Sequence, residues 1–156
     1  SKLTAENYCT MFSSLHGLAI TILRYASVYG PGLTQRTALP IFIERAQRNE
    51  NIYLYGDGTR SQDYVYVDDV IEANMLAAQK SVTGIFNIGS GKKTTMNNLA
   101  RTIIDVFKSK SKIKYDLTKP QEFSIGIDIS KAKMELGYRP KHNLRSGLIK
   151  YRESTK

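Results

Sequence analysis

The 156-residue sequence has little cysteine and no long apolar run, and these absences exclude several classes of protein. A single cysteine, Cys9, rules out an internal disulfide framework. Because His16 and His142 lie far apart and only one cysteine is present, we expect no Cys/His zinc site and no other metal. No apolar run approaches the roughly 18 residues of a membrane helix, so we expect no membrane span. The first residues contain no apolar signal-peptide core, which favours a cytoplasmic location.

Acidic residues are also scarce relative to basic ones. The sequence has 14 Asp and Glu against 23 Lys and Arg, a formal net charge of +9, and such a balance invites a nucleic-acid interpretation. However, the densest basic stretch, residues 108–119, separates most of its lysines by serines and forms no helical basic stripe with interleaved aromatic residues. We therefore interpret it as a solvated face and expect no nucleic-acid partner. A positive surface attracts small phosphorylated anions as readily as polymers.

Helical and strand patterns alternate along the whole chain, which is typical of an α/β fold. The apolar spacing of residues 3–16 predicts an amphipathic helix that ends at Gly17, and residues 19–25 predict a strand buried on both faces. After these we expect a helix around 39–46, strands over 51–55 and 61–67, a helix beginning near 68, a strand over 85–88, a helix capped by Thr94 or Thr95, a strand over 112–117, a short helix from 128 to 137, and a helix over about 143–152.

Some local patterns lead to sharper structural expectations. The pair Asp57-Gly58 between two strands predicts a β-hairpin. In the helix that follows, Ile71, Met75 and Ala78 are expected to form the buried face. Cys9 is expected to be a buried thiol within its helix.

Taken singly, the polar motifs favour structural roles over chemical ones. Residues 89–91, Gly-Ser-Gly, lie between a strand and a helix, where backbone amides can bind a phosphate. Because the sequence has neither the full glycine spacing of a dinucleotide-binding turn nor a Walker lysine after it, a structural turn is favoured. Asp68 and Asp69 fit helix capping better than a shared ligand, because neighbours on a helix point about 100° apart. Tyr64 and Tyr66 share a strand face, which favours packing over stacking on a base. These residues alone predict an α/β domain and leave its function open.

Five segments are weak evidence singly but become informative when their order and spacing along the chain are considered together. They are residues 1–6 (Ser-Lys-Leu-Thr-Ala-Glu), 23–32 (Leu-Arg-Tyr-Ala-Ser-Val-Tyr-Gly-Pro-Gly), 55–70 (with Gly-Asp-Gly and Asp-Tyr-Val-Tyr-Val-Asp-Asp-Val), 86–91 (Phe-Asn-Ile-Gly-Ser-Gly) and 128–140 (from Asp-Ile-Ser-Lys-Ala-Lys to Leu-Gly-Tyr-Arg-Pro). Together they resemble the C-terminal half of the extended short-chain dehydrogenases/reductases, the NAD-dependent nucleotide-sugar epimerases and dehydratases of the UDP-glucose 4-epimerase type.

The resemblance implies the last elements of a Rossmann domain plus a small substrate-binding α/β domain, with the N-terminal Rossmann half absent. Residues of about 1–30 and 64–91 resemble the Rossmann part, and 31–63 and 92–156 the nucleotide-sugar-binding part. It also implies NAD as cofactor, a nucleotide-sugar substrate, and a homodimer of the full-length protein formed through the helix at 3–16. The family's glycine-rich turn and catalytic tyrosine would lie before Lys2, so we expect no turnover from this chain alone.

The resemblance further assigns roles to single residues. Lys2 corresponds to the catalytic-motif lysine, which binds the nicotinamide ribose and lowers the pKa of the catalytic tyrosine because a neighbouring ammonium favours tyrosinate. Tyr25 would flank the nicotinamide. Ser27 stands where the family usually has a substrate-contacting Asn, and Leu39 and Pro40 stand where the substrate nucleotide is met.

The remaining implied contacts concern the nucleotide and its diphosphate. Tyr53 and Tyr55 resemble the strand that lines the uracil pocket. The family's phosphate-binding Arg is Gln62 here, and Arg60, two residues earlier and therefore on the same strand face, is expected to compensate.

The family's later Arg-Pro-Gly-Asp segment is approximated by residues 119–122, Lys-Pro-Gln-Glu. Lys119 would meet the diphosphate as a point charge, and Glu122 would hold a ribose hydroxyl. Two alternatives stay open: an NADPH-dependent reductase of the same superfamily, and a non-catalytic binding module that uses the positive surface.

Overall fold

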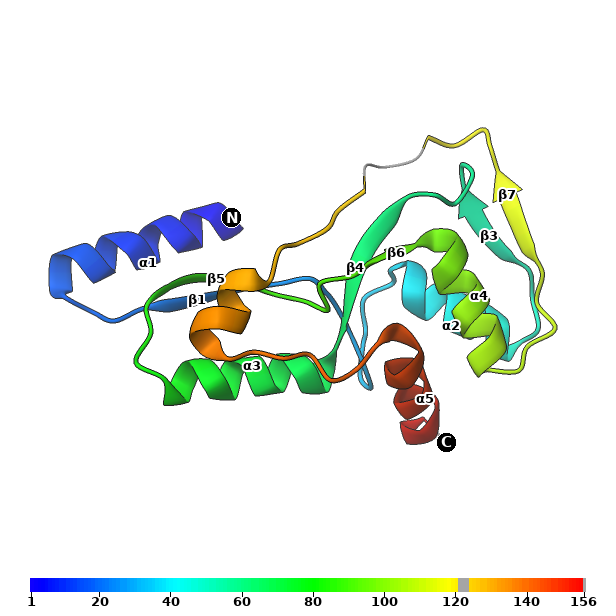
Figure 1. The fold of residues 1–156 in the computed structure, drawn as a ribbon. Coiled ribbons are helices and arrows are strands. Elements are labelled where there is room, and N and C mark those ends of the chain that lie inside the picture. The colour runs from blue at the N-terminus through cyan, green and yellow to red at the C-terminus, as the bar shows by residue number, and fades with distance from the viewer. Residues whose placement is uncertain (121–123, 156) are drawn as a thin grey trace.

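The computed structural model describes residues 1–120 and 124–155, and Glu122 therefore lies outside the described residues. The molecule is elongated, with α1, α3, β1 and β5 at one end and α2, α4, β3 and β7 at the other, joined by the long β4 (Figure 1). The helices are α1 (Lys2–His16), α2 (Ala38–Gln47), α3 (Val67–Gln79), α4 (Met96–Val106), a π-type turn η1 (Ala132–Leu136) and α5 (Leu144–Ser154). The strands are β1 (Thr21–Tyr25), β2 (Ser27–Tyr29), β3 (Ile52–Tyr55), β4 (Ser61–Tyr66), β5 (Gly84–Ile88), β6 (Lys93–Thr95) and β7 (Ile113–Asp116).

Pairing between distant strands builds three small sheets. β1 pairs in parallel with β5, from Thr21 opposite Gly84 to Tyr25 opposite Ile88. β2 pairs in parallel with β4, which also pairs antiparallel with β6, and β3 pairs in parallel with β7. Parallel strands joined through helices confirm the predicted α/β fold.

Helix ends follow the local chemistry of the sequence. Gly17 ends α1 in the left-handed conformation at φ 65°, which a residue without a Cβ adopts without strain. At the start of α4, Thr95 Oγ1 accepts a hydrogen bond from the Asn98 amide at 3.1 Å. Gly137 ends η1 at φ 72°. These predicted boundaries are confirmed.

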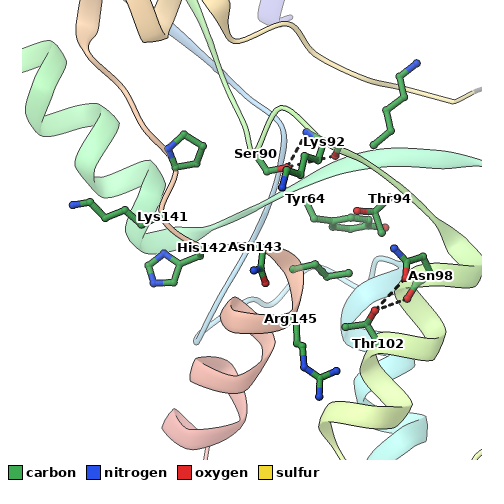
Figure 2. A pocket seen from close by; sticks show the side chains of 13 residues that line it. Tyr64, Ser90, Lys92, Thr94, Asn98, Thr102, Lys141, His142, Asn143 and Arg145 are labelled. Atoms are coloured by element: carbon green, nitrogen blue, oxygen red, sulfur yellow. Dashed lines mark hydrogen bonds between the residues drawn. The ribbon is translucent and has the colours of Figure 1, made fainter.

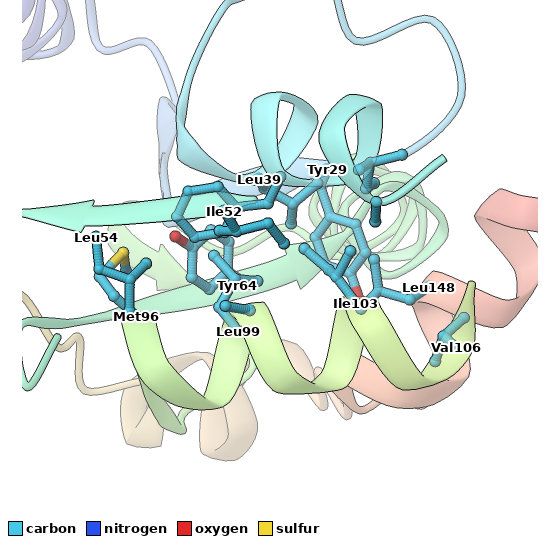
Figure 3. Close-up of a cluster of buried hydrophobic side chains, with 14 of the residues drawn as sticks. Tyr29, Leu39, Ile52, Leu54, Tyr64, Met96, Leu99, Ile103, Val106 and Leu148 are labelled. Atoms are coloured by element: carbon cyan, nitrogen blue, oxygen red, sulfur yellow. The ribbon is translucent and has the colours of Figure 1, made fainter. Parts of the chain in front are cut away.

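Two buried clusters hold the fold together. The larger one, shown in Figure 3, packs α2, α4 and α5 around β3 and includes Leu39, Ile52, Leu99, Ile103 and Leu148. The smaller one joins β4, β5, α3 and η1 through residues such as Val65, Val70, Phe86, Ile88 and Leu136. Tyr64 and Tyr66 are 5% and 3% exposed and belong to the larger cluster, as their shared strand face predicts.

The predicted hairpin around Asp57-Gly58 is wrong. β3 pairs with β7 instead of β4, and the turn between β3 and β4 is fixed from elsewhere: the Gly56 amide donates to the Asp116 carbonyl at 2.9 Å and the Asn97 amide donates to the Gly58 carbonyl at 3.0 Å. A turn-forming pair sets the local bend, whereas the partner strand is chosen by pairing with a segment far along the chain.

Three burial predictions are also wrong. β1, predicted to be buried on both faces, has no buried residue, because it pairs only with β5 in a two-stranded sheet of the described residues. In α3 the buried residues include Val70 and Ala73, whereas Ile71 and Met75 are more than half exposed, because the face carrying Val70 and Ala73 packs toward β4 and η1. No residue of α1 is buried, and Cys9 is only partly covered, since few contacts cover this helix.

Candidate functional site

The parallel pairing of β2 with β4 brings two predicted substrate positions into contact. Ser27 begins β2 opposite Tyr64, and the Gln62 side chain reaches back to it, with Nε2 donating to Ser27 Oγ at 2.6 Å. Both side chains are half-buried. The pair is neutral, so it can orient the polar groups of a ligand but cannot neutralise a phosphate.

Alternation along β3 places Tyr53 and Tyr55 on the outer face of its sheet, where they are 50% and 56% exposed. Each ring has a cation beside it. The Arg45 guanidinium lies 5.1 Å from the Tyr53 ring centroid, and Lys119 Nζ lies 4.6 Å from that of Tyr55. The structure thus joins Tyr55 and Lys119, two predicted contacts that are far apart in sequence, into one aromatic and cationic surface.

Arg60 directly precedes β4 and is half-buried. Its Nη1 lies 3.9 Å from Met96 Sδ. Burial raises the pKa of the Tyr64 hydroxyl, and the positive charge of Arg60 opposes that rise. Arg60 therefore lies close enough to Tyr64 for its charge to act on that hydroxyl, and its action on a phosphate stays a prediction.

Leu39 and Pro40, in the first turn of α2, differ in exposure. Leu39 is 1% exposed and packs in the larger cluster, whereas Pro40 is half-buried. A ligand can therefore meet this turn through Pro40 or the backbone, but not through the Leu39 side chain.

Of the two residues assigned to the cofactor, Tyr25 ends β1 and Lys2 begins α1. The Tyr25 ring is 46% exposed, and its hydroxyl donates to Asn74 Oδ1 at 2.9 Å, which fixes the ring against α3. α1 is tied to the same strand end, since Arg24 Nε donates to Glu6 Oε1 at 2.8 Å. Lys2 is exposed and lies about one helical turn before Glu6.

The Gly-Ser-Gly turn is structural, as its sequence favours. Its amides already have an anion: the buried Asp63 carboxylate accepts from the Ser90 amide at 2.9 Å, the Ser90 hydroxyl at 2.7 Å and the Gly91 amide at 2.8 Å. A Cβ at Gly89 would lie 2.9 Å from Asp63 Oδ2, so the close approach requires glycine. The donors that a phosphate would need are occupied.

Asp68 and Asp69 lie in the first turn of α3, where their charge complements the helix dipole, but the predicted capping is wrong, since α3 has no side-chain cap hydrogen bond. Asp69 is 1% exposed and instead accepts from the amides of Lys141 and His142 at 3.0 and 3.1 Å. His142 Nδ1 lies 2.9 Å from Asp69 Oδ1, and its ring lies 4.9 Å from that of Tyr66. Sequence reasoning gives His142 no role, because its partner lies more than 70 residues away.

Two searches over the described residues concern membrane helices and metal clusters. None of their helices is long and apolar enough to cross a bilayer. Over the same part of the chain, no group of three or more His, Cys, Asp or Glu is placed to hold a metal ion.

Comparison with known proteins identifies a common family. Residues 1–89 match the model of the NAD dependent epimerase/dehydratase family. A Methanocaldococcus jannaschii protein, provisionally named a UDP-glucose 4-epimerase, is 35% identical over 95% of this chain and 49% of its own length. UDP-glucuronic acid decarboxylase 6 of Arabidopsis thaliana is 34% identical over 94% of this chain and 44% of its own length.

A solved structure gives the same result for the fold. UDP-glucose 4-epimerase of Thermotoga maritima, determined with UDP-glucose, superposes with a TM-score of 0.89 at 36% identity, covering 99% of this chain and 53% of its own. The chain thus spans about half the length of the curated relatives it matches.

Proposed function

The chain belongs to the NAD-dependent epimerase/dehydratase family, and on this premise we propose that it forms the nucleotide-sugar-binding half of an NAD-dependent epimerase or dehydratase of the UDP-glucose 4-epimerase type. The proposal keeps the division into a Rossmann part (about 1–30 and 64–91) and a nucleotide-sugar-binding part (31–63 and 92–156), and it includes a cytoplasmic location. The observation that carries it is the surface made by Tyr55 and Lys119.

The residues near the end of β1 fit a nicotinamide cofactor. The exposed Tyr25 ring, fixed through its hydroxyl, offers a flat face at the carboxyl end of a parallel strand, the usual place for a dinucleotide in such sheets. Lys2, which is exposed, offers an ammonium for a ribose hydroxyl. The chemistry that bound NAD supplies in this family is reversible hydride transfer.

The residues around β3 and β4 fit the two ends of a nucleoside diphosphate. Tyr55 offers an exposed ring for the base, and the Lys119 ammonium beside it offers a charge for the diphosphate. Arg60 adds a second positive charge, and the Ser27–Gln62 pair offers hydroxyl and amide groups to the sugar.

The contribution of these residues to the reaction is positional. Holding the nucleotide at β3 and the nicotinamide ring at Tyr25 keeps the sugar between them, which converts an encounter of two molecules into a reaction within one complex. The buried contacts of Asp63 and Asp69 support this geometry, because they fix the segments on either side of β4.

Replacing Tyr55 by Ala is expected to weaken UDP binding about ten-fold or more, since stacking of a base on an aromatic ring contributes about 1–3 kcal/mol. Lys119→Ala is expected to weaken it about ten-fold through the diphosphate. Isothermal titration calorimetry with UDP, dTDP and GDP measures both effects and identifies the preferred base. Lys110→Ala, at an exposed position elsewhere, serves as the matched control for Lys119→Ala.

Equal UDP affinity in Tyr55→Ala and the parent chain would contradict the proposal. Binding of NADPH without any response to a nucleoside diphosphate would favour the reductase alternative. Binding of a short DNA duplex that weakens steeply with salt, without a nucleotide response, would favour the non-catalytic module.

The proposal includes a homodimer of the full-length protein through α1. This helix exposes an apolar stripe, with Leu3 and Leu15 each 68% exposed, Tyr8 58% and Phe12 46%. A second copy of the helix would bury such a stripe. We expect sedimentation velocity of the full-length protein to show a dimer, and Phe12→Glu to shift it to a monomer. Asn7→Glu, at an exposed position next to Tyr8, is the control and should leave the dimer intact. A monomer at every concentration would contradict this part of the proposal.

A further inference from the structure

A pocket of about 450 Å³ borders β4 and β6 next to the Ser27–Gln62 pair: its lining includes Tyr64 and Thr94, which pair in the sheets with Ser27 and Gln62. It opens between β4, β6, α4 and the start of α5, and we call it the α4–α5 pocket (Figure 2). Its volume is in the range of small-molecule sites, roughly 300–1,000 Å³. None of its lining residues is a predicted NAD or nucleotide-sugar contact.

The lining of the α4–α5 pocket is strongly cationic. It includes Lys92, Lys93, Lys141 and Arg145, and no Asp or Glu occurs among the described residues that line it. Two of these cations have partners at the rim: Arg145 pairs with Asp105, and Lys141 Nζ lies 2.8 Å from Glu72 Oε2.

Lys92 and Lys93 form no ion pair with any residue in the described ranges 1–120 and 124–155, so the pocket keeps an excess of positive charge. The start of α5 adds to it, because Asn143, the N-cap, and Leu144 lie on the lining and the first turn of a helix carries the positive end of its dipole. The charges of Lys92 and Lys93 and the positive end of the α5 dipole both stabilise a bound anion.

Uncharged polar groups occupy the other side of the pocket. Asn98 and Thr102 lie one turn apart on α4, and Thr102 Oγ1 donates to the Asn98 carbonyl at 2.7 Å. The Ser90 hydroxyl is held by Asp63 at 2.7 Å. Tyr64 contributes its ring between these groups and α5 (Figure 2). These side chains are fixed before a ligand arrives, and hydroxyl and amide groups of this kind match the hydroxyls of a sugar.

We propose that the α4–α5 pocket binds a phosphate ester of a small polyhydroxyl compound, with the phosphate at Lys92 and the start of α5 and the hydroxyl groups at Asn98 and Thr102. The site shares no residue with the proposed nucleotide-sugar surface, and it gives part of the net charge of +9 a specific use.

Titration of the 156-residue chain with glucose 6-phosphate, inorganic phosphate and glucose tests the proposal. We expect glucose 6-phosphate to bind more tightly than either of the others, and to shift the NMR signals of the Asn98 side chain and of the amides at 90–94. Lys92→Glu is expected to weaken binding at least about ten-fold through loss of a charge-assisted contact. Lys110→Glu, the same charge change at an exposed position elsewhere, is expected to change it less than about two-fold.

Three results would overturn the proposal. Equal affinity for inorganic phosphate and glucose 6-phosphate would show that the sugar hydroxyls make no contact in the pocket. Equal binding of glucose 6-phosphate by Lys92→Glu and by the parent chain would show that Lys92 does not contact the phosphate. Loss of glucose 6-phosphate binding in Tyr55→Ala, with Lys92→Glu unaffected, would place the ligand on the nucleotide-sugar surface. Thermal melts of each variant confirm that a loss of binding is not a loss of fold.

Discussion

Asp69→Ala is expected to lower the free energy of unfolding by about 3 kcal/mol, one of the two largest effects we expect from a single substitution. The carboxylate is 1% exposed and accepts hydrogen bonds from two backbone amides and the His142 ring. Without it, the amides of Lys141 and His142 lose their acceptor inside the fold. The segment that leads into α5 then loses its attachment to α3.

Asp68→Ala is the matched control, because Asp68 occupies the same first turn of α3 and has the same charge. Its carboxylate lies at the surface, 2.6 Å from Lys150 Nζ, with 43% of its side chain exposed. An exposed ion pair of this kind contributes less than about 1 kcal/mol. Chemical denaturation of both variants measures the difference, and Asp69→Asn, which keeps one acceptor oxygen, should fall between them.

A loss of less than about 1 kcal/mol in Asp69→Ala would show that water replaces the carboxylate at little cost. The buried contact would then be a consequence of the fold, without a large share in its stability. That result would also contradict the proposal that Asp69 fixes the segments beside β4.

Local sequence rules predict the elements of this fold well and their partners poorly. The left-handed Gly17 and Gly137 and the Thr95 cap depend on neighbours within a few residues, and the structure confirms them. The pairing of β3 with β7 depends on a segment about 60 residues away, and the Asp57-Gly58 pair contains no information about it.

The buried face of α3 shows a second limit. The helix carries apolar residues on two faces, one with Val70 and Ala73 and one with Ile71 and Met75, and the spacing rule accepts either. The choice comes from packing against β4 and η1, which the sequence of the helix itself does not contain.

The residues of the candidate site can be predicted from the sequence, but the contacts between them cannot. Family resemblance points to Ser27, Gln62, Tyr55 and Lys119 one by one, but the Ser27–Gln62 hydrogen bond and the Tyr55–Lys119 contact exist only in three dimensions. His142 is missed altogether, because a lone histidine without a neighbouring partner has no local pattern.

Gly147→Ala is expected to lower the free energy of unfolding by about 2 kcal/mol, although alanine is the better helix former by about 1 kcal/mol. A Cβ at Gly147, inside α5, would lie 2.1 Å from Tyr29 Oη and 3.1 Å from Tyr66 Cδ2. Tyr29 is 2% exposed and closely packed against Tyr66, with ring centroids 5.5 Å apart, so the ring has little room to move away. The steric cost therefore exceeds the gain in helix propensity.

The same contact predicts that Tyr29→Phe partly rescues Gly147→Ala. Alone, Tyr29→Phe loses a long hydrogen bond to the Leu144 carbonyl, 3.3 Å, at a cost of about 0.5–1 kcal/mol. In the double variant the atom at 2.1 Å is gone and the nearest tyrosine ring atom, Cζ, lies 2.9 Å from the new Cβ. A double-mutant cycle should then give a favourable coupling of at least about 1 kcal/mol, whereas additive losses would show that the Tyr29 hydroxyl is not what limits the space at Gly147.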